Sequence, residues 1–284
     1  MKAILLVLGL VLSLRGGFAS GAESPTPTVK TSTAQANVSL LPELLQIPGL
    51  NRQRQIRVYV PPGYANSQRR YPVLYMHDGQ NLFDAATAYA GEWRVDETLN
   101  ALSESRQLEL IVVGIDNGQE KRMTELNPWS HPRFGVAEGR EYMEFVVQVV
   151  KPLIDRRYRT KADRANTAIM GSSMGGLISH YAISQYPEVF SKAGIFSPAY
   201  WVGEAMFELV ESRPAKRDAR LYLLMGGREG DTMVSGIHRM AASLLKAGHP
   251  GANLSLKIVP QAQHNEAFWS EEFGQAVLWL FAPE

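Results

Sequence analysis

The chain has 284 residues, of which 45% are hydrophobic and 20% charged, as is typical of one sizeable globular domain rather than a disordered or fibrous protein. A formal net charge of +1, without a long run of like charge, argues against nucleic acid or an anionic membrane as the partner and favours a small molecule. The absence of cysteine excludes disulfides, thiolate zinc sites and cysteine nucleophiles.

The N-terminus has the order of a secretory signal. Lys2 precedes an apolar run over residues 3–14, and small residues follow as far as Ala22. The run is shorter than the roughly 20 residues that span a bilayer, so we favour cleavage near Ala22 over a membrane anchor. Residues 1–22 are therefore predicted to be a signal peptide. We expect no stable membrane insertion after its removal and a secreted or bacterial periplasmic location.

Residues 23–38 are rich in Ser, Thr, Pro and Ala and are predicted to be a linker, followed by a single domain over residues 39–284. β-Branched and apolar runs predict strands at 55–60, 71–76, 108–115, 167–170, 193–196, 221–225 and 254–259. Helical spacing predicts helices at 92–102, 142–154, 174–185, 205–210, 232–247 and 265–280, with Pro152 bending or ending the second.

Alternating strands and helices predict an α/β fold with a mostly parallel sheet of about eight strands and helices on both faces. A short polar stretch, residues 63–70, joins the first two strands, and we expect those two strands to form an antiparallel edge. Ligands of such sheets bind beyond the carboxyl ends of the strands. Catalytic groups are therefore sought in the loops that lead from strands into helices.

One of these loops carries the pentapeptide Gly171-Ser-Ser-Met-Gly175, between a short buried strand and a helix. A G-x-S-x-G string in this context predicts a nucleophile elbow, in which a strained turn exposes the central serine. The flanking glycines avoid collisions in that turn. Ser173 is therefore the candidate nucleophile, and Ser172 is predicted to be dispensable for attack.

A serine hydroxyl needs a base, and His264 alone among the six histidines directly follows the last predicted strand and precedes the last helix. A surface or capping role is the simpler interpretation of His238 and His249. A carboxylate should orient the base, and the loop after strand 221–225 offers Glu229 and Asp231. We choose Glu229, because Asp231 is the more natural helix cap.

The oxyanion of an acyl-transfer reaction needs backbone donors. We expect one donor to be the N–H of Met174 and the other the N–H of Gln80, in the loop after strand 71–76. Asp78, in the same loop, must then point away and brace it.

Tyr200 and Trp201 are candidates for the wall of the substrate pocket, with core packing as the alternative for each. Residues 117–140 form a long loop that is a candidate lid or specificity loop. In this loop Arg122 is a candidate receptor for an anionic substrate group, with pairing to Glu125 as the alternative.

Together these segments resemble the putative-esterase family of α/β-hydrolases, which contains feruloyl esterases, enterochelin-type siderophore esterases and esterase D. The resemblance covers about residues 50–280. It rests on the motifs at 75–84, 112–117, 171–177, 196–198, 226–229 and 264–269. It implies that Ser173, Glu229 and His264 form a catalytic triad for ester hydrolysis. Relatives with a His-Gly loop near the oxyanion hole differ from this chain, which has His77-Asp-Gly-Gln80.

The resulting hypothesis is a secreted serine carboxylesterase that works through an acyl-enzyme, without a metal or organic cofactor, on a small-molecule or glycan-linked ester. The alternatives are an acyltransferase with the same triad and a non-catalytic binding protein on the hydrolase scaffold. The sequence carries no indication of the oligomeric state.

Overall fold

The structure is a computed structural model that describes residues 30–105 and 107–282, and its residues from Thr31 onward form one compact unit. The predicted signal peptide and most of the predicted linker lie outside the described residues. Within residues 32–37, which belong to that linker, Ser32 Oγ donates a hydrogen bond to Asp84 and the backbone N–H of Gln35 donates one to Asp96. This part of the chain lies against the domain.

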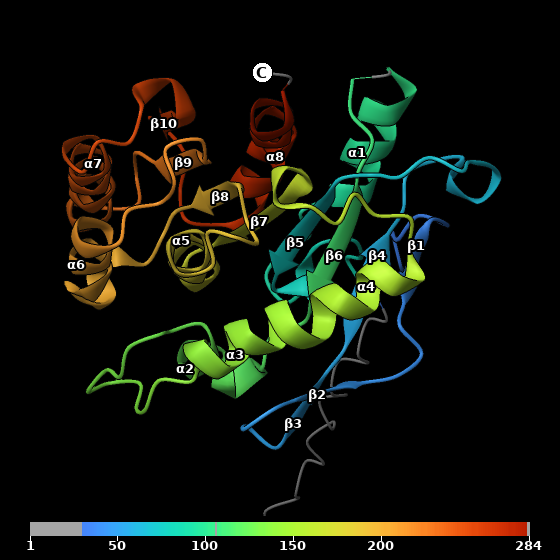
Figure 1. Cartoon of the computed structure of the whole chain (residues 1–284), viewed down its shortest axis with the longest axis horizontal. Coiled ribbons are helices and arrows are strands. Elements are labelled where there is room, and N and C mark those ends of the chain that lie inside the picture. The colour runs from blue at the N-terminus through green and yellow to red at the C-terminus, as the bar shows by residue number, and fades with distance from the viewer. Residues whose placement is uncertain (1–29, 106, 283–284) are drawn as a thin grey trace, which may run out of the picture. The chain divides into compact units, whose positions relative to one another are not determined.

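A sheet of eight strands forms the centre of the unit, in the order β1-β4-β6-β5-β7-β8-β9-β10 (Figure 1). At one edge β4 pairs antiparallel with both β1 and β6, and all the other neighbouring strands are parallel. The bounds are β1 Val38–Leu40, β4 Ile56–Tyr59, β5 Val73–His77, β6 Ile111–Ile115, β7 Thr167–Ser172, β8 Lys192–Phe196, β9 Arg220–Gly226 and β10 Leu254–Val259. The predicted α/β-hydrolase fold is confirmed.

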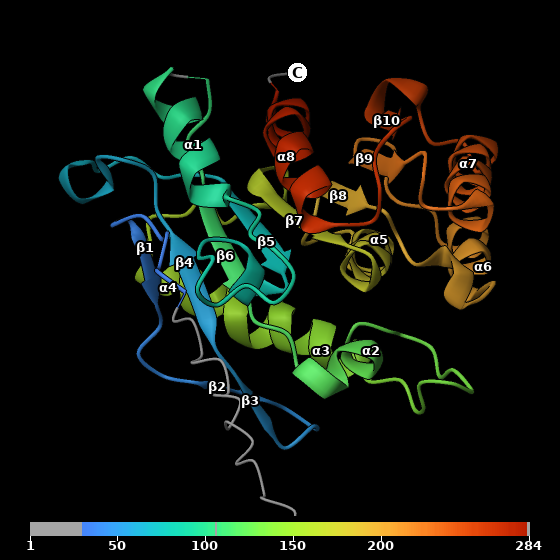
Figure 2. The ribbon, with the colours of Figure 1, turned by 180° about the vertical axis from the view of Figure 1, so that it is seen from behind.

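Helices cover both faces of this sheet, as Figures 1 and 2 show from opposite sides. Side chains of α1 and α8 pack with Leu74 and Met76 on one face, and side chains of α3 to α7 pack with Tyr75 and Ile169 on the other. The bounds are α1 Val95–Glu104, α2 Arg122–Glu125, α3 Gly139–Phe145, α4 Lys151–Arg157, α5 Met174–Gln185, α6 Ala205–Ser212, α7 Asp231–Lys246 and α8 Glu266–Phe281. None of the described helices is long and apolar enough to cross a membrane.

The expected antiparallel edge of the first two predicted strands is wrong. The strand β4 pairs with β1 and β6, whereas β5 lies inside the sheet, parallel to β6 and β7. All five residues of β5 are buried, which is the pattern of a parallel strand covered on both faces. The short link between the strands suggested a hairpin, but burial of both faces of β5 decided its place.

The helix predicted at 142–154 does not end at Pro152 but continues to Arg157. A π-helical segment, Val146–Val150, joins α3 to α4, and the N–H of Lys151 donates to the carbonyl of Val146. Pro152, which follows, has no N–H and would crowd the carbonyl four residues earlier. A wider turn at this point relieves that conflict.

A small antiparallel pair, β2 Leu45–Ile47 and β3 Arg52–Arg54, was not predicted. Its arginines bind the long loop after β6. Glu125 is fully buried there and accepts hydrogen bonds from both Arg52 and Arg54. The pair thus anchors α2 beside the carboxyl end of the sheet.

Candidate active site

Ser173 occupies a sharp turn between β7 and α5. Its backbone has φ 58° and ψ −119°, a strained conformation for a residue with a side chain. Its N–H donates to the carbonyl of Phe196, and its own carbonyl accepts from Ala199 and Leu177. Ser173 is half-buried, whereas Ser172 is 5% exposed. The turn therefore presents the second serine, as a nucleophile elbow requires.

The glycines of the pentapeptide are needed for close backbone approach. A Cβ at Gly171 would lie 2.8 Å from the carbonyl carbon of Gly175, and one at Gly175 would lie 3.3 Å from the Cβ of His77. At Gly176, the residue after the pentapeptide, a Cβ would lie 2.7 Å from the carbonyl oxygen of Phe196. Real side chains do not tolerate the two shorter of these distances. The predicted steric reason for glycine at position 171 is thus borne out by the backbone itself.

Glu229 and His264 meet although 35 residues separate them. His264 Nδ1 lies 2.7 Å from Glu229 Oε2. The Glu229 side chain is 1% exposed, whereas that of His264 is 38% exposed. Asp231, the alternate acid, is exposed in the first turn of α7, after Gly230. The structure therefore brings Glu229, and not Asp231, to the histidine.

The second carboxylate oxygen of Glu229 is also fully bonded. Oε1 accepts from the hydroxyl of Ser197 at 2.6 Å and from the N–H of Gly226 at 2.8 Å. Trp269 Nε1 in turn donates to Ser197 Oγ at 2.9 Å, and the Trp269 ring meets the His264 ring edge-on at 4.9 Å. Both oxygens of this buried carboxyl group therefore have hydrogen-bond partners.

Ser197 and Trp269 have roles that sequence reasoning missed, although both stand in the motifs on which the family resemblance rests. The signal was available in the Ser-Pro pair after β8 and in the Trp that follows His264 by five residues. Neither residue type indicates a support for a carboxylate until the fold brings β8, β9 and α8 together.

Ser173 Oγ makes no hydrogen bond to any described residue. Hydrogen bonds between nucleophile and base are often long or poorly aligned before substrate binds. The elbow and the His264–Glu229 pair both lie beyond the carboxyl ends of neighbouring parallel strands, β7 to β10 (Figure 1). This common edge is where a parallel sheet brings its catalytic loops together.

Both expected oxyanion donors are free of protein acceptors within the described part of the chain. The N–H of Met174 is the first of α5, where backbone donors have no helical partner. The N–H of Gln80 lies in a 3-10 turn, Gly79–Asn81, while the Gln80 side-chain oxygen accepts from the N–H of Asn117. The positive end of α5 also favours negative charge at this point.

Asp78 braces this loop, as expected, and its partner is Arg122. The guanidinium donates from Nε to Oδ1 at 2.6 Å and from Nη2 to Oδ2 at 2.9 Å, and Asn117 donates to Oδ1 at 2.6 Å. Arg122 and Asn117 hold the pKa of Asp78 below its usual value against the effect of burial.

The alternative of an Arg122–Glu125 pair is wrong, because Glu125 accepts hydrogen bonds from Arg52 and Arg54 of β3 instead. Arg122 is engaged with Asp78 and presents no free guanidinium fork to an anionic substrate.

Tyr200 takes the core-packing alternative. It is 5% exposed, and its hydroxyl lies 2.7 Å from Nδ1 of the fully buried His180. Trp201, the next residue, is 44% exposed and meets the Phe134 ring edge-on at 5.9 Å. Phe134 belongs to the long loop, so this loop and Trp201 together form an aromatic surface. Trp201 follows by two residues Ala199, whose N–H donates to the carbonyl of Ser173.

The surface interpretation of His249 is wrong, because this residue is 4% exposed. Burial lowers the pKa of His249, lowers that of His180 to about 3 and lowers that of His77 to about 4. His77 is 2% exposed, and its Nδ1 lies 2.7 Å from the hydroxyl of Tyr142. These histidines are neutral core residues.

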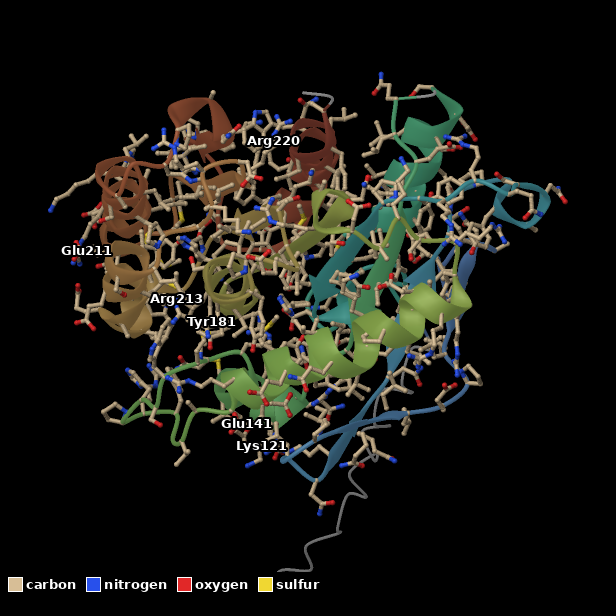
Figure 3. All side chains as sticks on the ribbon, viewed as in Figure 1. Lys121, Glu141, Tyr181, Glu211, Arg213 and Arg220 are labelled. Carbon is tan, nitrogen blue, oxygen red and sulfur yellow. The ribbon has the colours of Figure 1, made fainter. Side chains whose placement is uncertain are left out.

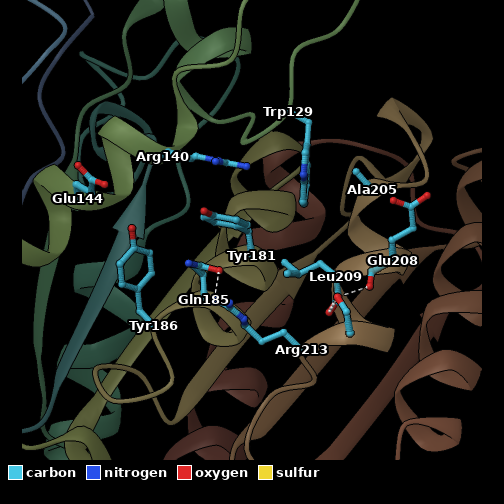
Figure 4. Close-up of a pocket in the computed structure, with 11 residues that line it drawn as sticks. Trp129, Arg140, Glu144, Tyr181, Gln185, Tyr186, Ala205, Glu208, Leu209 and Arg213 are labelled. Atoms are coloured by element: carbon cyan, nitrogen blue, oxygen red, sulfur yellow. Dashed lines mark hydrogen bonds between the residues drawn. The ribbon is translucent and has the colours of Figure 1, made fainter.

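The long loop also forms one wall of a groove of about 600 Å³ between α3, α5 and α6. Trp129 of the loop meets Tyr181 edge-on at 5.6 Å, and Arg213 donates to Gln185 at 2.7 Å (Figure 4). Tyr181 and Arg213, which both line this groove, are labelled in the view of the whole chain (Figure 3). Tyr181 is eight residues from Ser173, about 12 Å along an α-helix, so this groove is separate from the elbow.

Comparison with known proteins supports the same family. Residues 47–280 match the model of the family described as putative esterase. The "Uncharacterized protein YbbA" of Bacillus subtilis is 27% identical over 243 residues, which cover 80% of this chain and 92% of that protein. The iron(III) salmochelin esterase of Escherichia coli is 26% identical over 69% of this chain, but the match spans only 48% of that protein.

Among solved structures, the IroE-like serine hydrolase from Shewanella oneidensis has the same fold. The two superpose with a TM-score of 0.71 at 20% identity, over 86% of this chain and 80% of that one. This likeness concerns the fold alone. The family match covers most of the described domain, and the chain therefore belongs to the putative esterase family, as a serine hydrolase that acts on ester bonds.

Proposed function

We propose that this protein is an exported serine carboxylesterase whose triad is Ser173, His264 and Glu229. The observation that carries the proposal is the contact of 2.7 Å between His264 Nδ1 and a buried carboxylate whose other oxygen has two donors. A carboxylate held in this way selects the tautomer of the imidazole that leaves Nε2 free to accept a proton.

In the proposed reaction, Ser173 Oγ attacks the ester carbonyl carbon while His264 Nε2 accepts the hydroxyl proton. The N–H groups of Met174 and Gln80 stabilise the tetrahedral oxyanion. His264 then returns the proton to the leaving alcohol as the C–O bond breaks, which leaves an acyl-enzyme. Water attacks the acyl group with His264 as base, and the free acid and Ser173 are released.

We further propose that the acyl group lies against the exposed ring of Trp201 and the loop that carries Phe134. Such an aromatic wall would favour planar aromatic acyl groups over acetyl, because ring contacts add specific stabilisation to apolar burial. The test is a panel of p-nitrophenyl and methyl esters with acyl groups of graded length and aromaticity. Equal kcat/KM for acetyl and aromatic esters would contradict this assignment.

The decisive experiment for the activity is labelling with a fluorophosphonate probe followed by peptide mapping, alongside turnover of p-nitrophenyl acetate. We expect the label on Ser173 and its loss in Ser173→Ala. Absence of both label and turnover would favour the non-catalytic binding protein. An acyl-enzyme that releases no free acid, but transfers its acyl group to an added alcohol or sugar to form a new ester, would favour the acyltransferase.

Export is proposed from the N-terminal pattern, and N-terminal sequencing of the protein isolated from the periplasm or medium tests it. We expect the mature chain to begin near residue 23. An intact Met1 on the cytoplasmic protein would contradict export.

A further inference from the structure

Three acidic side chains converge at the start of α1, away from the triad. Glu92 precedes this helix, and Asp96 and Glu97 lie in its first turn. One carboxylate oxygen from each of the three lies within 4.8 Å of the others. We call Glu92, Asp96 and Glu97 the acidic cluster.

Asp96 is the central member, and its burial is unusual for a carboxylate without a cationic partner. The residue is 0% exposed. Its Oδ2 accepts from the N–H of Gln35 at 2.8 Å, but Oδ1 has no hydrogen-bond partner among the described residues. Glu97 Oε2 is likewise buried and without a donor. A buried oxygen without a donor needs a partner that the described residues do not supply, either a proton or a cation.

Burial and the neighbouring Glu97 carboxyl raise the pKa of Asp96 to about 7. The pKa of Glu92 is also raised, by burial and by Glu97 and Asp84. Two carboxylates in contact can be stabilised either by one shared proton or by a bound cation. These two possibilities make opposite predictions for added metal.

The positive charge nearby does not satisfy the cluster. Arg94 Nε lies 3.8 Å from Glu97 Oε1, and its side chain is 65% exposed. The N-terminus of α1 favours negative charge, but it supplies no donor to Asp96 Oδ1. The three carboxylates, with Asp84 close by, therefore leave a strong local excess of negative charge.

We propose that the acidic cluster binds a hard divalent cation of the calcium type. Its donors are all oxygens, with no histidine or cysteine, which disfavours zinc. The spread of the donor atoms suits one ion about 2.3–2.6 Å from each, and calcium accepts the irregular ligand sets that carboxylates and water provide. The charge of the three carboxylates compensates the ion and leaves room for water ligands.

Two segments would be fixed by such an ion. The first is residues 32–37, where Thr33 Oγ1 donates to Glu92 at 2.9 Å and the N–H of Gln35 donates to Asp96 at 2.8 Å. Trp93, next to Glu92, stacks on Phe196 at 5.5 Å and meets Trp269 at 5.8 Å. Trp269 is the residue that supports Glu229 through Ser197. The cation therefore acts as a structural brace behind the site and takes no part in the chemistry.

The experiment uses the mature chain, treated with EDTA and dialysed, and titrated with calcium chloride by calorimetry, with magnesium chloride in parallel. We expect calcium binding with a dissociation constant below about 1 mM and a rise in Tm of about 3–6 °C at tenfold excess over that constant. The readout is binding and not turnover, so it does not depend on the proposed esterase mechanism.

Asp96→Asn should weaken calcium binding at least about tenfold, because it removes the most buried of three charged ligands. Glu97→Gln, at a partly exposed side chain, provides a second variant if Asp96→Asn does not fold. The matched control is Glu120→Gln, at an exposed acidic residue outside the cluster, which should bind calcium as the parent does.

No calcium-dependent heat or Tm shift in the parent, or parent-like affinity in both cluster variants, would overturn the proposal. A Tm that responds to pH but not to calcium would assign the shared proton instead.

Discussion

Glu229 and Asp96 are both almost completely buried carboxylates, and their surroundings differ. Glu229 has donors at both oxygens, from Ser197, Gly226 and His264. Asp96 has one backbone donor and faces another carboxyl group. The protein therefore satisfies the buried carboxyl group of Glu229 with its own donors, whereas that of Asp96 needs an added proton or cation.

This difference separates a carboxylate organised for chemistry from one organised for structure. Substitutions around Glu229 should lower turnover with little change in stability. Substitutions around Asp96 should change stability and metal response with little change in chemistry. The following experiments test that separation, beginning with the largest effect.

Ser173→Ala should lower kcat/KM by at least about 10³-fold, because it removes the proposed nucleophile. Its Tm should stay close to that of the parent, since the hydroxyl has no hydrogen bond to a described residue. Ester turnover and thermal unfolding measure the two quantities. Ser172→Ala is the matched control and should retain activity, and a comparable loss in both variants would contradict the assignment.

Glu229→Gln should lower kcat by about 10³–10⁴-fold with a smaller change in KM. The amide is nearly isosteric but does not stabilise the imidazolium or select the same tautomer. Steady-state kinetics on an activated ester measure the effect, with Asp231→Asn as the control. If Asp231→Asn were the more damaging variant, the choice of Glu229 would be wrong.

Trp269→Phe should lower kcat about tenfold while KM changes little. The ring against His264 is kept, but Ser197 loses the N–H donor that fixes its hydroxyl toward Glu229. Ser197→Gly removes the hydroxyl itself at a residue with φ 42°, a backbone conformation that glycine tolerates. A fall in stability without a change in kcat would give these residues a structural role only.

Acid should destabilise the protein through its buried histidines. The pKa values of His77 and His180, about 4 and about 3 when folded, lie below the unfolded value of 6.5. The unfolded chain therefore binds more protons, and stability falls as pH drops from about 6.5 toward 4. Urea unfolding at a series of pH values measures this, and a flat profile in that range would contradict the neutral buried state.

Asp96 should have the opposite and smaller effect in metal-free protein. Its folded pKa of about 7 lies above the ordinary value of 3.8, so its contribution to stability is lost as pH rises from about 4 to 7. Calcium should restore stability at neutral pH, and Asp96→Asn should remove both the pH-dependent loss and the calcium response. Turnover of this variant, measured well below its Tm, should stay within about threefold of the parent.

Local patterns were sufficient for most of the fold and for the candidate residues. The runs at 167–170 and 174–185 predicted β7 and α5 because strand propensity, glycine spacing and helical period agree there. The order of serine, acid and histidine loops singled out Ser173, Glu229 and His264. These are short-range signals, and they need no knowledge of which segments meet.

Long-range packing decided the rest. The place of β5 inside the sheet, the pairing of Arg122 with Asp78 and the support of Glu229 by Ser197 and Trp269 all join segments distant in the chain. The members of the acidic cluster are neighbours in sequence, yet only the fold buries Asp96 beneath residues 32–37. Sequence determined which groups are available, whereas burial and pairing, which depend on the whole tertiary structure, determined which of them are charged, bonded or left without a partner.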